Sequence, residues 1–341
     1  GNTTMQQLLM GVNPAALGEM PFVPAAGRAL CLASSDLGLA IHPLGRAYLF
    51  PVIGGFLGGD TVAGILATDL AQSPGPTLLI DIGTNGELVL AYDGQLVATS
   101  TAAGPAFEGA RIKYGMRASS GAIEKVLFDG DVRINVIGDA APIGLCGSAL
   151  IDTVAGLLDS GLLMPEGLLL DPALLPDTTP PNLARRMTPG DAGFDFVLVH
   201  EEESGLDAPI VLTQQDVREL QLAAAAIRAG VQILLNKFGL TSPDLHRVLI
   251  AGGFGNFIRR SHAQRIGLLP ADIPHDRITY VGNASLAGAQ LTALSRKARH
   301  AAAELAGRAE RIDLSLDPQF QMAFIEGMNF PDASSPGEEK S

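Results

Sequence analysis

A carboxylate at the mouth of a glycine-rich turn is the group in this chain best suited to phosphate chemistry. Asp81 ends an apolar run that begins at Leu78, and a second apolar run begins at Leu88. The glycines between them can adopt positive φ, the backbone amides can converge on an anion, and two short polar side chains can bond a phosphate. The turn consists of Gly83, Thr84, Asn85 and Gly86.

Asp81 is the predicted catalytic residue and metal-linked carboxylate. A carboxylate at a strand end can hold Mg²⁺ through water, and it can also orient a water for attack on a phosphate. The alternative is an ordinary hairpin, since Asn-Gly is the commonest two-residue hairpin turn. Glu87 points either to solvent or to a water near the metal, and both interpretations stay open.

A second glycine cluster follows the apolar run 247–251. A flat ligand such as adenine can lie on exposed glycine backbone, and the alternative is a tight strand-to-helix turn. The run 280–289 reads as a third strand, which enters a helix of small residues that packing alone can explain. The order of these three elements is more specific than any one of them. The second turn consists of Gly252, Gly253, Phe254, Gly255 and Asn256.

Two further segments are predicted to border the same ligand. Gly147 and Ser148 open a helix, whose N-terminus favours an anion, although structural capping competes with that role. Gly104, Pro105 and Glu108 form either a wall of the cleft or a simple strand-to-helix turn. His262, like the other histidines, is interpreted as a surface or packing residue.

Composition excludes several classes of function. The net charge of −13 argues against a nucleic-acid partner. No apolar run reaches the length of a membrane-spanning helix, and no secretory signal pattern is present. Cys31 and Cys146 cannot build a disulfide framework, which favours the cytoplasm, and no Cys/His set has metal-ligand spacing.

The order of these motifs resembles the ASKHA superfamily of acetate kinase, sugar kinases, heat-shock chaperones and actin. A small-residue helix that begins near Asp60, its expected N-cap, precedes the phosphate turn, and the second glycine turn and another small-residue helix come later. The resemblance implies an α/β, ribonuclease H-like fold with two lobes around a nucleotide cleft. It also implies ATP and Mg²⁺ as cofactors, with adenosine on the second turn. By that order Asp81 belongs to the second phosphate motif, and we expect the first one upstream of Gly1.

Eight short motifs carry a closer resemblance. They are GNTTM at 1–5, DIGTNGE at 81–87, STAAGPAFEG at 100–109, GMRA at 115–118, CGSALID at 146–152, TQQDVRELQLA at 213–223, AGGFGNF at 251–257 and GNASLAGA at 282–289. Together they resemble the reductive activators of corrinoid enzymes. Such proteins use ATP to restore Co(I) from Co(II), so the resemblance implies a corrinoid protein or corrinoid-dependent methyltransferase as partner. It implies a (2Fe–2S) cluster in a preceding N-terminal domain, and a homodimer is possible.

The resemblance suggests how the chain is divided. Residues 1–72 are expected to be the remainder of the first ASKHA lobe with its connecting helix, 73–331 the C-terminal ATPase lobe, and 332–341 a disordered tail. Within the second part, Thr213 and Asp216 predict the start of the longest helix, and 291–308 is predicted to be one helix.

Two departures from the family pattern leave alternatives open. Ala224 stands where the family has a lysine, which removes a possible nucleotide contact, and Ala149 stands where a glycine is usual. A small-molecule kinase on the same fold is one alternative function. A non-catalytic scaffold that docks on a corrinoid protein is another, and Ala224 would suit it.

Overall fold

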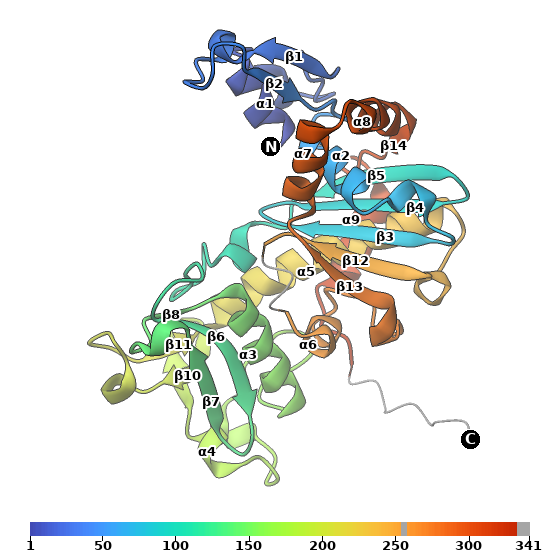
Figure 1. Ribbon diagram of the computed structural model, residues 1–341. Coiled ribbons are helices and arrows are strands. Elements are labelled where there is room, and N and C mark those ends of the chain that lie inside the picture. The colour runs from blue at the N-terminus through green and yellow to red at the C-terminus, as the bar shows by residue number, and fades with distance from the viewer. Residues whose placement is uncertain (254–257, 333–341) are drawn as a thin grey trace.

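A six-stranded mixed sheet organises the molecule. The computed structural model describes residues 1–253 and 258–332. Strands β3 to β5 form an antiparallel meander, whereas β12 joins β3, β13 joins β12 and β14 joins β5 in parallel (Figure 1). In sheet order the strands are β13 (Ile278–Gly282), β12 (Arg247–Ala251), β3 (Thr77–Ile82), β4 (Gly86–Tyr92), β5 (Gln95–Thr101) and β14 (Ala309–Arg311).

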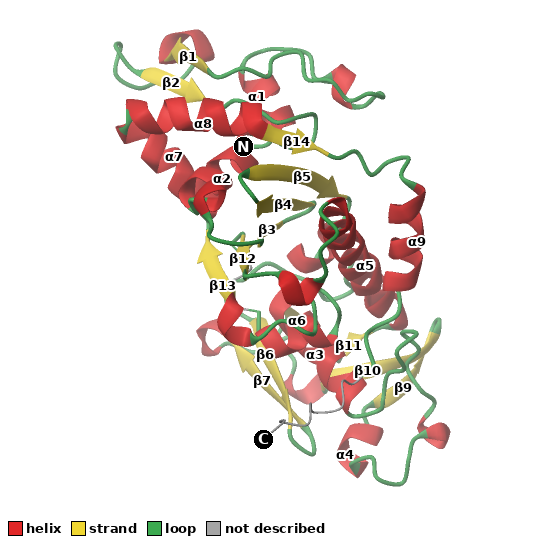
Figure 2. Ribbon diagram, turned by 90° about the vertical axis from the view of Figure 1, so that its right-hand side faces the viewer, coloured by secondary structure: helices red, strands yellow, loops and turns green. Residues whose placement is uncertain are grey.

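Both faces of this sheet are buried, which explains why its strands are almost continuously apolar. Alternate residues of β3 enter different cores: Leu78 and Ile80 belong to the core under helix α5 (Gln214–Lys237), and Leu79 belongs to the core under α2 (Gly59–Ala67). Figure 2 shows the sheet between these two helices. The two-residue period of a strand therefore places Asp81, two residues after Leu79, on the α2 face.

The predicted capping box of α5 is confirmed. The Thr213 hydroxyl accepts from the Asp216 amide, and the Asp216 carboxylate accepts from the Thr213 amide at 2.9 Å. Asp216 also accepts from the Lys113 amide at 2.8 Å, so the cap fastens the loop that contains Lys113 to the start of α5. Helix α9 (Pro318–Gly327) packs along α5.

Small residues bring the N-terminal segment against α2. This segment contains α1 (Thr3–Leu9) and a two-stranded sheet of β1 (Leu30–Ala33) and β2 (Arg46–Leu49). A Cβ at Gly58 would lie 2.5 Å from the Thr3 nitrogen, so no larger residue fits this contact. In the same way, a Cβ at Gly288 would lie 2.1 Å from the Ala63 oxygen, where α7 (Ala284–Leu294) crosses α2.

The lower part of the molecule in Figure 1 carries two small three-stranded sheets and helix α3 (Gly147–Asp159). Phe128 and Phe196 stack with ring centroids 5.8 Å apart and join the sheets. One sheet has the order β7 (Val132–Val136), β6 (Ala122–Phe128), β8 (Gly144–Leu145), and the other β11 (Ile210–Leu212), β10 (Gly193–Val199), β9 (Met187–Gly190). Two short helices complete this part, α4 (Pro181–Ala184) and α6 (Arg260–Arg265).

The predicted single helix 291–308 is wrong. Ser295 has an extended backbone, with φ −132° and ψ 121°, and its side chain caps the next helix by accepting from the Ala298 amide. The segment is therefore two helices, α7 and α8 (Arg296–Arg308). All but the first residue of the predicted tail 332–341 lies outside the described residues. Within the described ranges no helix has the length and apolarity needed to cross a membrane.

Candidate functional site

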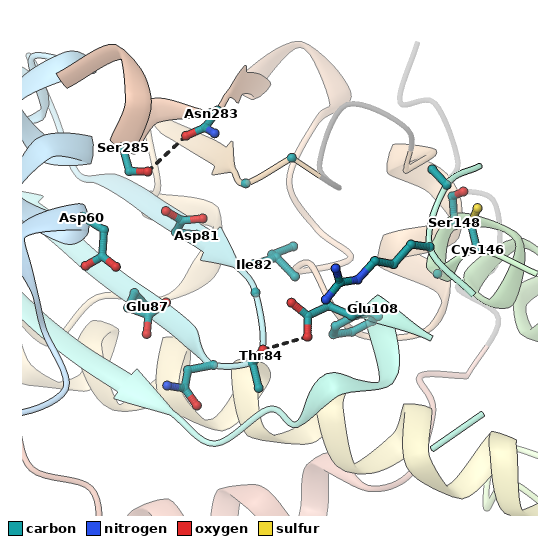
Figure 3. Close-up of a pocket in the computed structure, with 18 of the residues that line it drawn as sticks. Asp60, Asp81, Ile82, Thr84, Glu87, Glu108, Cys146, Ser148, Asn283 and Ser285 are labelled. Atoms are coloured by element: carbon teal, nitrogen blue, oxygen red, sulfur yellow. Dashed lines mark hydrogen bonds between the residues drawn. The ribbon is translucent and has the colours of Figure 1, made fainter. Parts of the chain in front are cut away.

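A cleft of about 620 Å³ lies where β3 ends and α3 begins. Figure 3 shows Asp60, Asp81 and Glu87 on one side of it and Cys146 and Ser148 on the other. Most of the predicted site residues line this one cleft, although they come from segments far apart in the chain. These are Asp81, Gly83, Thr84, Asn85, Glu108, Gly147, Ser148, Gly252 and Gly253.

Asp81 and Glu87 face each other across β3 and β4. They are direct cross-strand partners on the α2 face of the sheet, a position where two like charges are destabilising. Burial, and then the neighbouring Asp60 carboxylate, raise the pKa of Asp81 to about 6. Burial, followed by Asp60 and Asp81, raises the pKa of Glu87 to about 8, and the Ser100 hydroxyl donates to Glu87 at 3.3 Å. Glu87 lines the cleft beside Asp81, and its contact with a water near the metal stays a prediction.

Asp60 is a cleft residue that the sequence analysis did not assign. It is in the first turn of α2 and is not the N-cap, because Gly58 occupies that position. Its Oδ1 accepts from the Thr61 amide at 2.9 Å. The sequence offered one sign of this role, a carboxylate at the start of a small-residue helix. Only the tertiary packing of α2 on the sheet brings Asp60 near Asp81.

The donor chemistry of this wall fits a hydrated Mg²⁺. Among the described residues, no group of three or more His, Cys, Asp or Glu side chains is placed to enclose a metal ion. Mg²⁺, however, usually keeps several waters and uses one or two carboxylates together with substrate phosphates. Asp81, Asp60 and Glu87 lie close together, and no described cation pairs with Asp81, so this carboxylate suits that outer-sphere role.

The first glycine turn does not use its glycines as predicted. Neither Gly83 nor Gly86 has positive φ, and the Gly83 amide already donates to the Asn85 carbonyl at 3.0 Å. Gly86 is a packing residue that does not line the cleft: it faces α5, where a Cβ would lie 2.8 Å from Thr101 Oγ1 and 2.9 Å from Ile227 Cγ1. The structure therefore does not bring Gly86 together with the other predicted site residues.

The segment after β5 contributes Phe107 and Glu108 to the cleft. Gly104 has φ +78° and Pro105 begins a short helical turn, and neither lines the cleft, so for these two the simple turn is the better interpretation. Glu108 does line it and accepts from the Thr84 hydroxyl at 2.7 Å (Figure 3). That bond ties the phosphate turn to the opposite segment.

The start of α3 forms the facing wall. Gly147 is the first helical residue, as predicted, and the first-turn amides of a helix have no intrahelical acceptor. The Ser148 hydroxyl is occupied, because it donates to the Glu124 carbonyl at 2.8 Å. Burial raises the pKa of the Cys146 thiol, as is typical of a packed, unreactive side chain.

The second glycine turn approaches β3 closely. Gly252 has φ +101°, and a Cβ there would lie 2.6 Å from the Ile82 oxygen, whereas Gly253 has open space around the corresponding position. Phe254, Gly255 and Asn256 lie outside the described residues. Ala224 is buried in α5 and does not line the cleft.

A hydrogen bond fastens α6 to α3, and it gives His262, interpreted as a surface or packing residue, a specific buried partner. Its Nδ1 lies 2.6 Å from Oδ1 of Asp152, whose other oxygen accepts from the Val126 amide at 3.1 Å. Asp152 is only 3% exposed. A histidine at a regular helical spacing gives no sign of a partner 110 residues away.

The fold and the cleft together define an ASKHA-type protein, and the comparisons with known proteins agree. The C-terminal domain of RACo, the ASKHA domain, matches residues 75–338, and the RACo middle region matches residues 1–73. The chain belongs to the RACo family of reductive activators.

Individual relatives carry corresponding names. The corrinoid activation enzyme RamQ of Eubacterium limosum is 37% identical over 333 residues, which is 97% of this chain and 55% of RamQ. A Methanosarcina barkeri protein named [Co(II) methylated amine-specific corrinoid protein] reductase is 30% identical over 274 residues, 72% of this chain and 44% of its own length. A solved structure titled reductive activator for corrinoid,iron-sulfur protein superposes with a TM-score of 0.87 at 39% identity, over 97% of this chain and 52% of that one. The chain thus spans about half the length of the relatives it matches.

Proposed function

We propose that this chain is the ATP-hydrolysing part of an activator that returns the cobalt of a corrinoid protein from Co(II) to Co(I). One electron is added to the cobalt, and it comes from an iron–sulfur cluster outside these 341 residues. The partner is a corrinoid protein or a corrinoid-dependent methyltransferase. Residues 1–72 and 73–331 act as two units around the cleft.

The observation that carries this proposal is the placement of Asp81. The family membership supports corrinoid activation, and Asp81 supplies the group that nucleotide hydrolysis requires. It stands near the end of a central strand, next to a turn of short polar residues and beside the second glycine turn. Ligands of open α/β sheets commonly bind at the carboxyl ends of such strands.

The residues of the cleft have different roles in this proposal. Near pH 7 the raised pKa values leave Asp81 mostly ionised and Glu87 mostly protonated. Asp81 can then accept a hydrogen bond from a water and direct its lone pair at the terminal phosphate, while protonated Glu87 donates rather than repels. Mg²⁺, when bound, neutralises phosphate charge, with Asp81 holding it through water. Gly253 presents open backbone to the adenosine.

Hydrolysis and binding are separable by an Asp81→Asn variant. The amide keeps the size of the side chain but neither accepts a proton nor holds a hydrated cation well. We expect ATP turnover to fall by about 100-fold or more, while ATP affinity measured by calorimetry changes by less than about fivefold. Cobalt reduction is followed in the complete polypeptide that contains this chain, as the loss of Co(II) absorbance with ATP and a chemical electron donor.

The control is Asp313→Asn. Asp313 is a surface carboxylate remote from the cleft, which pairs with Arg311 at 2.7 Å and binds Ser315. Its variant should hydrolyse ATP at the normal rate. Unchanged turnover in Asp81→Asn would remove the assignment of Asp81, and absence of ATP binding by the unmodified chain would remove the ATPase proposal.

A further inference from the structure

The cleft is strongly acidic, and the one cation among its described lining residues lies on the wall that faces Asp81. The sheet wall presents Asp60, Asp81 and Glu87, and Glu108 and Glu124 also line the cleft. Among the described lining residues, Arg117 is the one cation. A polyanionic ligand placed among these carboxylates is repelled unless a positive group faces it, even when a metal ion offsets part of its charge.

The backbone that carries Arg117 is fixed. Gly109, with φ +80°, and Gly115 approach each other so closely that a Cβ at Gly115 would lie 2.1 Å from the Gly109 oxygen. The next residue, Met116, donates its amide to the Leu145 carbonyl at 3.0 Å, and Leu145 donates to the Tyr114 carbonyl at 2.9 Å. These bonds attach the loop to β8, the strand that leads directly into α3. Arg117 and the start of α3 therefore belong to one rigid wall.

The side chain of Arg117 has no partner among the described residues. It is exposed, and within the described part of the chain no carboxylate or carbonyl pairs with its guanidinium. By contrast Arg111, six residues earlier, pairs with Glu219 at 3.9 Å, and Arg186 pairs with Asp131 at 2.6 Å. A rigid loop that presents an unpaired arginine to an acidic cleft suits an anionic ligand.

We propose that Arg117 is the cationic contact for the phosphate chain of the bound nucleotide, made from the wall opposite Asp81. The planar guanidinium can hold two phosphate oxygens at once, which a metal on the sheet side leaves free. This assignment rests on the proposed nucleotide function and specifies which side chain of this chain binds the phosphates.

The test compares nucleotide and nucleoside binding in matched variants. Calorimetry measures the dissociation constants of MgATP and of adenosine for the unmodified chain, Arg117→Ala and Arg111→Ala. We expect Arg117→Ala to weaken MgATP binding by about 10- to 100-fold, the range for a lost charged hydrogen bond, and to leave adenosine binding unchanged. Arg111→Ala removes another exposed arginine of the same loop that does not line the cleft, and it should bind both ligands normally.

Two results separate the possible failures. If the unmodified chain binds MgATP and Arg117→Ala binds it equally well, or loses adenosine to the same degree, the phosphate contact is overturned while the ATPase proposal stands. If the unmodified chain does not bind MgATP, both proposals fail. Thermal unfolding of Arg117→Ala serves as the folding check, and an unchanged midpoint is expected because the side chain is exposed and unpaired.

Discussion

The two glycine turns at the carboxyl edge of the central sheet look alike in sequence but differ physically. In the turn after β3, neither Gly83 nor Gly86 uses positive φ, and Gly86 is small because α5 lies against it. In the turn after β12, Gly252 has φ +101° and its missing side chain leaves room for the Ile82 carbonyl. Glycine is therefore required by helix packing in the first turn and by backbone conformation in the second.

The turns also differ in charge. Asp81 and Glu87 flank the first turn as a cross-strand pair of carboxylates, whereas the described part of the second turn, Gly252 and Gly253, carries no side chain at all. A cation and phosphates suit the first, and a flat uncharged ring suits the second. Substitutions in each turn can test this distinction.

The largest effect is expected from Gly252→Ala. The new Cβ meets both an unfavourable φ and the Ile82 oxygen at 2.6 Å, so strain and overpacking add. We expect the free energy of unfolding to fall by about 3–4 kcal/mol. Urea unfolding followed by circular dichroism measures this change, and a loss below about 1 kcal/mol would show that the turn relaxes freely.

Glu87→Gln should change how stability depends on pH. The folded-state pKa of Glu87 is about 8 and its ordinary value is 4.5, so the folded protein holds a proton that the unfolded chain has lost. The stability of the unmodified protein should therefore decline as pH rises from about 4.5 to about 8, and Asp81 adds a decline of the same sign up to about pH 6. Gln has no proton to lose, so the variant should decline by a few kcal/mol less over this range. Unfolding midpoints from pH 5 to pH 9 provide the comparison, and parallel curves would contradict it.

Gly86→Ala should destabilise the fold through packing. Its Cβ would press on Thr101 and Ile227, at 2.8 and 2.9 Å, and we expect a cost of about 2 kcal/mol. Gly83→Ala is the matched control in the same turn, because the nearest atom to its Cβ is 3.7 Å away. Equal melting curves for the two variants would show that Gly86 is not a packing residue.

Gly253→Val should have the smallest effect on folding and a selective effect on ligand. A side chain there enters open space on the cleft surface, so stability should be nearly unchanged. We expect adenosine and ATP to bind about tenfold more weakly, which corresponds to ~1.4 kcal/mol. If calorimetry gives the original affinities, the second turn serves structure alone.

Local patterns were sufficient for the elements themselves and for the fold class. The apolar runs around Asp81 and after Arg247 predicted strands, and the Thr213–Asp216 box predicted the start of α5, because these signals lie within a few residues of one another. The ASKHA fold was implied by the resemblance of the motif order to that superfamily. The break at Ser295 was missed because a helical period continues across it, and a single capping serine is a weak local signal.

Tertiary structure alone decided which residues share the cleft. Asp60 lies in the cleft because α2 packs on the face of the sheet that carries Asp81 and Glu87. Gly86 does not line the cleft because it faces α5. Sequence specifies the two-residue alternation of a strand but not which helix covers each face. That choice depends on contacts between segments more than 100 residues apart, such as Gly86 with Ile227, and it appears only when the chain has folded.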